Sequence, residues 1–293
     1  MFTSRRALSR LVVLLAALAL VAAACGGDEA EGVDPDVSCE FGDLNLVTAG
    51  TLTVATGEQV FPPWMGVGDD LFDQPESKTG FEGALVYELA AELGFEDSDV
   101  TFVRTGFEEV IAPGPKDWDF NIQQYSITED RDQVVDFSVP YYTTRQALVT
   151  FPDSPFASPS SIDDLKDARL GAAIGTTSFD FVEDVIEPTT DVAVYDDNVN
   201  LVSAMTAGQI DGMVVDLPTA YFVIAVQVEG AQISAQFEAE AAAPDEYGML
   251  FADGNSLVSC VNEALNTLKD NGTLQRLEDE WLAQDGVIPT IGG

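Results

Sequence analysis

The chain has 293 residues, with 51 Asp and Glu against 12 Lys and Arg, no His, and a formal net charge of −39. This negative field repels nucleic acid and anionic lipid headgroups, so neither is expected as an electrostatic partner. Hydrophobic residues make up 46% of the chain, which is enough to build a core and excludes a largely disordered protein.

The first 24 residues have the pattern of an export signal. Three arginines precede the apolar run Leu11–Ala24, which is too short to span a bilayer. The letters VAAAC at positions 21–25 resemble a bacterial lipobox. We therefore predict a lipoprotein signal peptide over residues 1–24, lipidation of Cys25, and a protein outside the cytoplasm that is held to the cell membrane only through its lipid. An ordinary secretory signal is the alternative.

The segment after the signal is acidic, rich in Gly and without periodicity. Residues 25–44 are therefore predicted to be a flexible tether that follows the lipidated cysteine. Two further cysteines remain, and an even number in an exported chain predicts a disulfide between Cys39 and Cys260, with two free thiols as the alternative. A metal site is not expected without His, and no cofactor is predicted.

From Leu44 onward, short β-branched runs alternate with helical patterns, which is the signature of an α/β protein with parallel sheets. Two such series suggest two lobes. An extended segment at 140–150 joins them, and 255–282 predicts a helix pair broken at Asn271 and Gly272. Strands are expected at 51–56, 100–104, 119–122, 169–173, 191–195 and 212–215, and helices at 84–93, 179–186, 199–207 and 217–228.

Polar and aromatic side chains follow directly after several of these strands. Ligands of open α/β sheets bind outside the carboxyl ends of the strands, because loops and helix N-termini converge there. The side chains that follow the strands are therefore expected to share one rim. The candidate ligand-binding residues are Glu58, Phe61, Phe107, Gln124, Ser126, Arg131, Thr176, Thr177 and Asp216.

The chemistry of this rim suits an α-amino acid. Arg131 and the helix N-terminus at Thr177 can bind a carboxylate. Asp216 and Ser126 can accept hydrogen bonds from an ammonium group. A zwitterion is costly to desolvate unless both charges are paired, so groups for both ends are needed.

The order and spacing of several motifs point to a known family. The motifs are GTLTVAT and FPPW at 50–56 and 61–64, SITEDR and VDFSVPY at 126–131 and 135–141, GTT at 175–177, and Asp216 after a strand. They resemble the bacterial extracellular solute-binding proteins of family 3, the polar amino-acid-binding components of ABC transporters. The resemblance covers about residues 47–285.

This resemblance implies a two-lobed periplasmic-binding-protein-like fold, each lobe a sheet flanked by helices, with the ligand cleft between them. Lobe one would be residues 45–143 plus 244–293, and lobe two residues 144–243. The hinges would lie near Tyr142–Arg145 and Ala242–Tyr247. We expect a monomer that captures a free amino acid by lobe closure, with a polar or cationic side chain favoured, and delivers it to the permease subunits.

The resemblance also implies residue roles. Arg131 and Thr177 would hold the ligand carboxylate, and Asp216 and Ser126 the ammonium group. Two aromatic residues would enclose the ligand side chain, whose far end would lie near an acid. These last three residues are Phe61, Phe107 and Glu58.

The chain departs from the family pattern in two places. The motif Gly-Phe-Asp-x-Asp-Leu is here GFEGAL at 80–85, with its second acid lost. The two residues before Tyr125 are usually small, and here they are Gln123 and Gln124. The larger amides would reshape the pocket, so the specificity cannot be transferred from the family.

Each candidate also has a purely structural interpretation. Arg131 could form a surface ion pair with a neighbouring acid. Asp216, Thr176 and Ser126 could act only as helix caps. Aromatic residues are more often core than ligand contacts, and Trp64 is assigned to the core. Either of two further arginines, Arg104 and Arg145, could be a second cation in the cleft, but an ion pair that bridges the lobes is the simpler expectation.

An enzymatic function on the same scaffold is the alternative, such as a cyclohexadienyl or arogenate-type dehydratase. This reaction would need a general acid near the carboxylate site, for which Glu58 is the candidate. A sensory ligand-binding domain would need a membrane-spanning helix joined to a signalling domain, which the sequence does not suggest.

Overall fold

The computed structural model describes residues 38–238, 243–283 and 288–292, all within one compact unit, Asp36–Gly293. The predicted signal peptide, the lipidated Cys25 and the tether up to residue 37 lie outside the described residues. Within the described part of the chain, no helix combines the length and the apolar character needed to cross a membrane.

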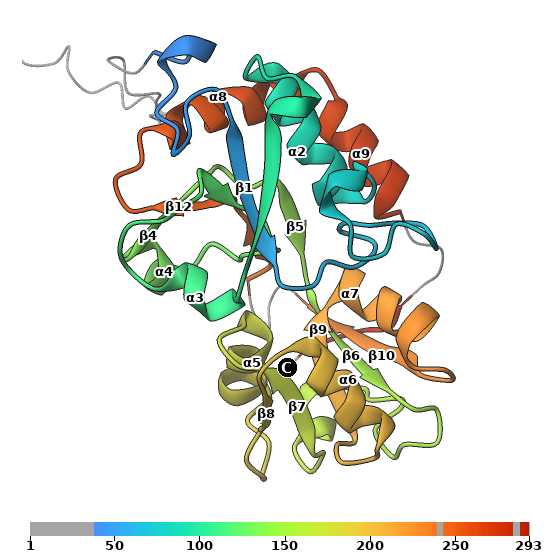
Figure 1. Ribbon diagram of the computed structural model, residues 1–293. Helices are drawn as coiled ribbons and strands as arrows, with labels where there is room; N and C mark the ends of the chain where they lie inside the picture. The colour runs from blue at the N-terminus through green and yellow to red at the C-terminus, as the bar shows by residue number, and fades with distance from the viewer. Residues whose placement is uncertain (1–37, 239–242, 284–287, 293) are drawn as a thin grey trace, which may run out of the picture. The chain divides into compact units, whose positions relative to one another are not determined.

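The first sheet has five strands in the order β2-β1-β3-β12-β4 (Figure 1). β1 pairs in parallel with β2 and β3, and β12 runs antiparallel to β3 and β4. All six residues of β1 are buried, as expected for a central strand. The strands are β1 Leu52–Gly57, β2 Val100–Thr105, β3 Phe120–Asn121, β4 Val135–Phe137 and β12 Leu250–Ala252.

Three helices pack against one another beside this sheet: α2 Phe81–Glu92, α8 Leu257–Asp270 and α9 Thr273–Trp281. The predicted break between the last two is present, because Gly272 adopts a φ of +79°, a conformation that glycine tolerates best. Two short helices, α3 Phe107–Ile111 and α4 Glu129–Asp132, follow strands of the same lobe.

The second sheet has six strands in the order β13-β10-β6-β9-β7-β8. β10 was not predicted; it lies antiparallel to β6 at the position where the chain returns through the lobe. The strands are β6 Gln146–Thr150, β7 Leu170–Ala173, β8 Ala193–Tyr195, β9 Gly212–Asp216, β10 Gln232–Phe237 and β13 Thr290–Ile291.

The last strand corrects the predicted lobe boundary. Lobe one was expected to include all of residues 244–293, but β13 pairs in parallel with β10 in the second sheet. Ile291 is buried in the second core together with Phe237. Ile288 packs against the other core of this lobe. The end of the chain therefore belongs to lobe two, because its apolar side chains find partners there.

The helices of the second lobe start close to where they were predicted. Two of them continue into π-helical turns: α5 Thr177–Phe181 into Val182–Ile186, and α7 Leu217–Phe222 into Val223–Gln227. The third is α6 Asn198–Thr206. Four short 3-10 helices complete the described elements: Phe41–Asp43, Pro75–Ser77, Asp97–Asp99 and Ile162–Leu165.

The segment between the lobes consists of two strands where one was predicted. β5 Tyr142–Thr144 pairs antiparallel with β11 Asp245–Tyr247 in a separate two-stranded ladder, and β6 begins only after Arg145. Two of the chain crossings between the lobes thus run side by side. Most of the predicted hinge positions fall on this ladder. Arg145, Ala243 and Pro244 lie just outside its strands, and Ala242 lies outside the described residues. Hinge motion itself stays a prediction.

The predicted disulfide is present in the structure, joining Cys39 to Cys260 of α8. It shows that the predicted tether ends earlier than residue 44. The ring of Phe41 packs edge-on against Phe95 with centroids 4.9 Å apart. Residues 38–43 are therefore attached to lobe one rather than flexible, because one covalent bond and one aromatic contact hold them.

Candidate functional site

A cavity of about 620 Å³ is lined by residues that follow strands of both sheets. Lobe one contributes the loops after β1, β2 and β3, and lobe two the loops after β7, β8 and β9. All nine candidate residues line it: Glu58, Phe61, Phe107, Gln124, Ser126, Arg131, Thr176, Thr177 and Asp216. The rule that sites form at the carboxyl ends of strands therefore correctly predicted that these residues border one cavity.

Arg131 is a buried residue of α4, with 8% of its surface exposed. Its Nη1 donates to the carbonyl oxygen of Ser126 at 2.7 Å, and its Nη2 to that of Gly175 in lobe two at 2.8 Å. The guanidinium also lies 5.6 Å from the ring centre of Phe107. Among the described residues it forms no ion pair, so the surface ion-pair interpretation is wrong. Burial lowers the pKa of Arg131.

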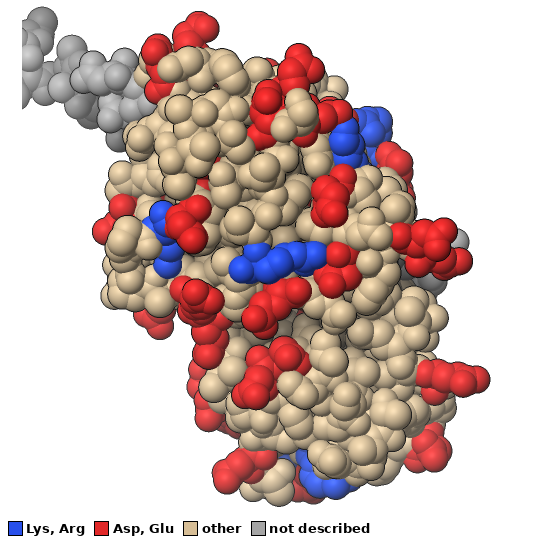
Figure 2. Space-filling model, in the orientation of Figure 1, with Lys and Arg blue, Asp and Glu red and all other residues tan. Residues whose placement is uncertain are grey.

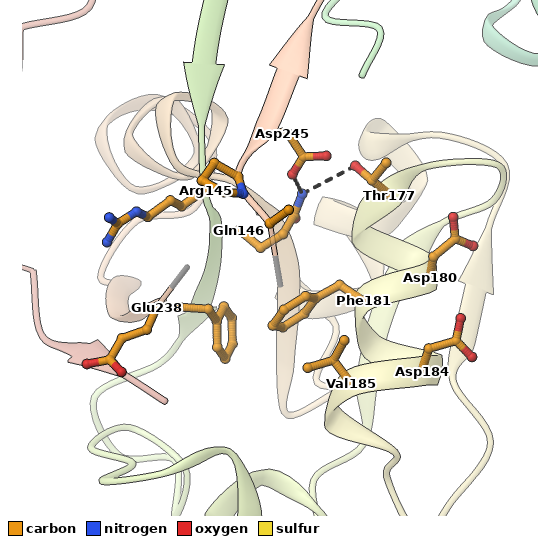
Figure 3. A pocket seen from close by; sticks show the side chains of 12 residues that line it. Arg145, Gln146, Thr177, Asp180, Phe181, Asp184, Val185, Glu238 and Asp245 are labelled. Carbon is orange, nitrogen blue, oxygen red and sulfur yellow. Dashed lines mark hydrogen bonds between the residues drawn. The ribbon is translucent and has the colours of Figure 1, made fainter. Parts of the chain in front are cut away.

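The start of α5 faces Arg131 from the other lobe. Thr176 is the N-cap and accepts a hydrogen bond from Phe179 N at 3.2 Å. The Oγ1 atom of Thr177 lies 3.3 Å from Ser126 Oγ, and the Gln146 amide donates to it at 3.4 Å. The same amide donates to Asp245 at 2.7 Å, as Figure 3 shows, so the two-stranded ladder is linked to the helix start.

Asp216 ends β9 and caps α7, accepting a hydrogen bond from Thr219 N at 3.0 Å. The predicted cap role is therefore present, and the residue also lines the cavity. Burial raises the pKa of Asp216 to about 6, because the apolar surroundings disfavour its charged form. Its neighbour Thr219 accepts a hydrogen bond from Trp64 Nε1 of lobe one at 3.3 Å.

The two aromatic candidates are half-buried rather than core residues. Phe61 stacks on Phe222 of lobe two with ring centres 5.6 Å apart, and Phe107 stacks on Tyr125 at 4.5 Å. Each ring is held by a partner while part of it borders the cavity. Trp64 is a core residue as assigned, with 1% of its surface exposed.

The sequence profile of bacterial extracellular solute-binding proteins, family 3, matches residues 52–284. The chain belongs to this family. It is 31% identical to the L-cystine-binding protein of Escherichia coli K12, over 83% of this chain and 87% of that protein.

Solved structures agree with this assignment. An ancestral arginine-binding protein bound to arginine has a TM-score of 0.65 and 28% identity, over 80% of this chain and 99% of that one. An ancestral amino acid-binding protein, described as a precursor of cyclohexadienyl dehydratase, has a TM-score of 0.63 and 26% identity, over 80% and 96%. The two-lobed fold expected from the motifs is confirmed.

One residue that supports the cavity wall of this solute-binding protein was missed by the sequence analysis. Glu82 of α2 is fully buried, and its carboxylate accepts hydrogen bonds from the backbone N–H of Gln124 at 2.9 Å, from the Gln124 side-chain amide and from the Tyr141 hydroxyl. Burial raises the pKa of Glu82 to about 7. The signal was available: Glu82 shares its helix face with Val86 and Leu89, so it interrupts an apolar stripe.

Acidic groups dominate the solute-binding protein's cavity. Among the described residues that line this cavity, Arg131 is the only Lys or Arg. Figure 2 shows that Asp and Glu also outnumber Lys and Arg over the face in view. The carboxyl groups in the lining are Glu58, Glu108, Glu109, Asp196, Asp197 and Asp216.

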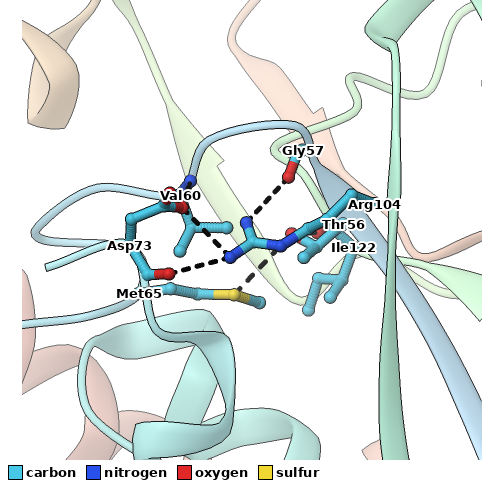
Figure 4. Close-up of polar contacts among 7 residues, drawn as sticks. All are labelled: Thr56, Gly57, Val60, Met65, Asp73, Arg104 and Ile122. Atoms are coloured by element: carbon cyan, nitrogen blue, oxygen red, sulfur yellow. Dashed lines mark hydrogen bonds and ion pairs between the residues drawn. The ribbon is translucent and has the colours of Figure 1, made fainter. Parts of the chain in front are cut away.

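Neither of the two arginines expected to bridge the lobes forms an ion pair with the other lobe among the described residues. Arg104 pairs with Asp73 at 3.0 Å and donates to the carbonyl oxygens of Gly57 and Asp73, all within lobe one (Figure 4). Arg145 is exposed and borders a smaller cavity of about 240 Å³ beside α5. The prediction of a lobe-bridging ion pair is wrong for Arg104, because the loop before α2 provides the nearer partner.

Proposed function

We propose that this solute-binding protein captures a free amino acid with a cationic side chain in the cavity between its lobes and delivers it to an ABC permease. The observation that carries the proposal is the charge pattern of the cavity. One buried guanidinium, Arg131, is available for the ligand carboxylate, and six carboxyl groups surround the remaining space.

The main-chain groups of the ligand have matching partners. Arginine has five N–H donors, and two of those of Arg131 are used by the carbonyl oxygens of Ser126 and Gly175. The remaining donors can bind the ligand carboxylate, with Thr177 opposite. Asp216 and Ser126 then accept from the ammonium group. Both charges of the zwitterion are paired, which its desolvation requires.

The side chain of the ligand would lie between Phe61 and Phe107. Aromatic faces attract cations, and the carboxyl groups at the rim attract them further. A glutamate side chain would meet only like charges there. Arginine, the named ligand of one solved relative, is a cationic amino acid. Cystine, the named ligand of another relative, carries two ammonium and two carboxylate groups and does not favour a cationic ligand by itself.

Lobe closure is the proposed means of capture. Arg131 and Ser126 belong to lobe one, and Gly175 and Thr177 to lobe two, so the carboxylate would touch both sides of the cleft. A ligand favours the closed state only as far as it binds that state better. Because the ligand would contact both lobes only in the closed state, it would bind that state more tightly than the open one. The paired strands β5 and β11 are the proposed hinge.

The location and partners follow from the N-terminal sequence and the family. Lipidation of Cys25 would anchor the protein to the membrane surface near its permease, with residues up to 37 as the tether. An ordinary secretory signal would instead leave the protein unanchored. We propose that the protein acts as a monomer.

A thermal-shift panel of the twenty amino acids tests this function, because a ligand that binds only the folded state raises its stability as RT ln(1+[L]/Kd). L-Arginine and L-lysine are expected to shift the melting temperature most and L-glutamate least. No shift with any amino acid, together with turnover of prephenate or arogenate, would favour the enzymatic alternative. Against that alternative, the proposed general acid Glu58 is exposed at the rim.

A further inference from the structure

The Glu82 carboxylate is a buried acceptor directly behind the cavity wall. It lies on α2, in the core of lobe one, with no exposed surface. Three donors converge on it: the backbone N–H and the side-chain amide of Gln124, and the hydroxyl of Tyr141. A carboxylate has about four acceptor positions, so all three bonds fit its ionised form.

These bonds define the conformation of Gln124. Its φ is +52°, a left-handed conformation that costs energy for residues other than glycine. The backbone bond to Glu82 compensates for that cost. Because an ionised carboxylate only accepts, the amide nitrogen of Gln124 must face Glu82 and the amide oxygen must point away. Gln124 lines the cavity, and its oxygen has no donor among the described residues.

We propose that Glu82 is a positioning residue that sets the ligand preference of the site by turning the side-chain oxygen of Gln124, rather than its nitrogen, towards the cavity. This inference rests on the proposed function and deepens it. An oxygen accepts a hydrogen bond from a guanidinium or ammonium group and repels a carboxylate. The preference for a cationic amino acid thus comes partly from an acid that never touches the ligand.

The arrangement makes affinity depend on pH. The titratable groups that act on Glu82 are Tyr141, Asp216 of lobe two and Tyr125. Burial raises the pKa of Glu82 to about 7, so it becomes protonated as the pH falls below this value. A protonated carboxyl can donate, and it then stabilises the opposite orientation of the Gln124 amide. The affinity for a cationic ligand should therefore decrease as the pH is lowered through about 7.

A double-mutant cycle with L-arginine as the probe tests the inference, using isothermal titration calorimetry at pH 8. E82Q has nearly the same shape, but its amide can also donate, so it no longer selects one orientation of Gln124. It is expected to weaken L-arginine binding about 10-fold. Q124G removes the amide while glycine keeps the left-handed turn and its backbone N–H. In the Q124G background, E82Q should change the affinity less than about 2-fold.

The possible outcomes separate the inference from the function. An equal loss from E82Q in both backgrounds would mean that Glu82 acts only on the fold, and unchanged affinity in E82Q would mean that it does not act at all. Either result overturns the inference. Failure of the wild-type protein to bind any amino acid overturns the proposed function and the inference with it.

A pH titration of affinity covers the case in which E82Q does not fold. The wild-type protein should lose affinity for L-arginine between pH 8 and 6.5, while Q124G should not. Protonation of Asp216, whose pKa is raised to about 6, should lower the affinity of both proteins to the same extent. Equal pH profiles for the two proteins would overturn the inference.

Discussion

The two walls of the cavity differ in how their polar groups are held. On the lobe-one side, Arg131 lines the cavity and Glu82 lies directly behind its wall, and both are buried and bonded to several partners. On the lobe-two wall, Thr176 and Thr177 are partly exposed at the start of a short helix and Asp197 is exposed, while Asp216 is the exception, held by its capping bond to Thr219. Burial and multiple hydrogen bonds hold charged groups in place before a ligand arrives, which lowers the entropic cost of binding.

This contrast suggests that the two lobes act at different stages of binding. Lobe one would receive the ligand with preformed groups, and lobe two would complete the site on closure. The contacts between the lobes include Arg131 to Gly175, Ser126 to Thr177, Trp64 to Thr219 and the stacking of Phe61 on Phe222. Changes to the lobe-one wall should therefore have larger effects on affinity than changes to the lobe-two wall.

The largest effect is expected from Arg131→Ala. Losing the guanidinium leaves the ligand carboxylate unpaired, which should weaken binding by about 3 to 5 kcal/mol, measured by calorimetry with L-arginine. Arg169→Ala is the matched control, because Arg169 is an exposed residue paired with Asp211 and does not line the cavity. Unchanged affinity in a folded Arg131→Ala protein would refute the carboxylate assignment.

Stability should depend on the disulfide of lobe one. Replacing Cys39 and Cys260 with Ser removes a cross-link between residues 221 positions apart. Chain-entropy arguments put the loss at about 2 to 5 kcal/mol of unfolding free energy. Urea unfolding checks this value, while L-arginine affinity should stay the same because neither cysteine lines the cavity. A large loss of affinity would show that the cross-link also shapes the lobe-one wall.

A smaller effect is expected on the lobe-two wall from Asp216→Asn. Asparagine can still cap α7, so the helix should remain while the negative charge is lost. Affinity should fall by about 1.5 to 3 kcal/mol. In the wild-type protein the pKa of Asp216 is raised to about 6, so the charge disappears and affinity falls as the pH drops through 6. The variant should lack this step; if the step persists, another group holds the ammonium.

The smallest effect concerns stability and Glu82. Its pKa is raised to about 7, so the folded protein holds a proton that the unfolded chain releases above about 4.5. The contribution of this group is fully present below pH 4.5 and is lost as the pH rises to 7. The wild-type protein should therefore lose on the order of 1 kcal/mol relative to E82Q between pH 6 and 7.5. Parallel stability curves from urea unfolding would contradict this expectation.

The core elements were predictable because their signals are local. The run at 51–56 is apolar and β-branched, and the helix pair at 255–282 repeats apolar residues at helical spacing. The motif residues were placed in one cavity because each follows directly after a strand. Strands β4, β11, β12 and β13 were missed, since strands of two or three residues rarely show a period. The six-residue β10 was missed as well.

By itself, the sequence determined the family, the two-lobed fold, the pairing of Cys39 with Cys260, and which residues reach the cleft. Only the tertiary structure decided that the chain end joins lobe two and that Glu82 holds Gln124. The reason is physical. Periodicity and motifs report which face of an element is apolar, whereas a hydrogen bond between residues 42 positions apart depends on where the fold brings their atoms.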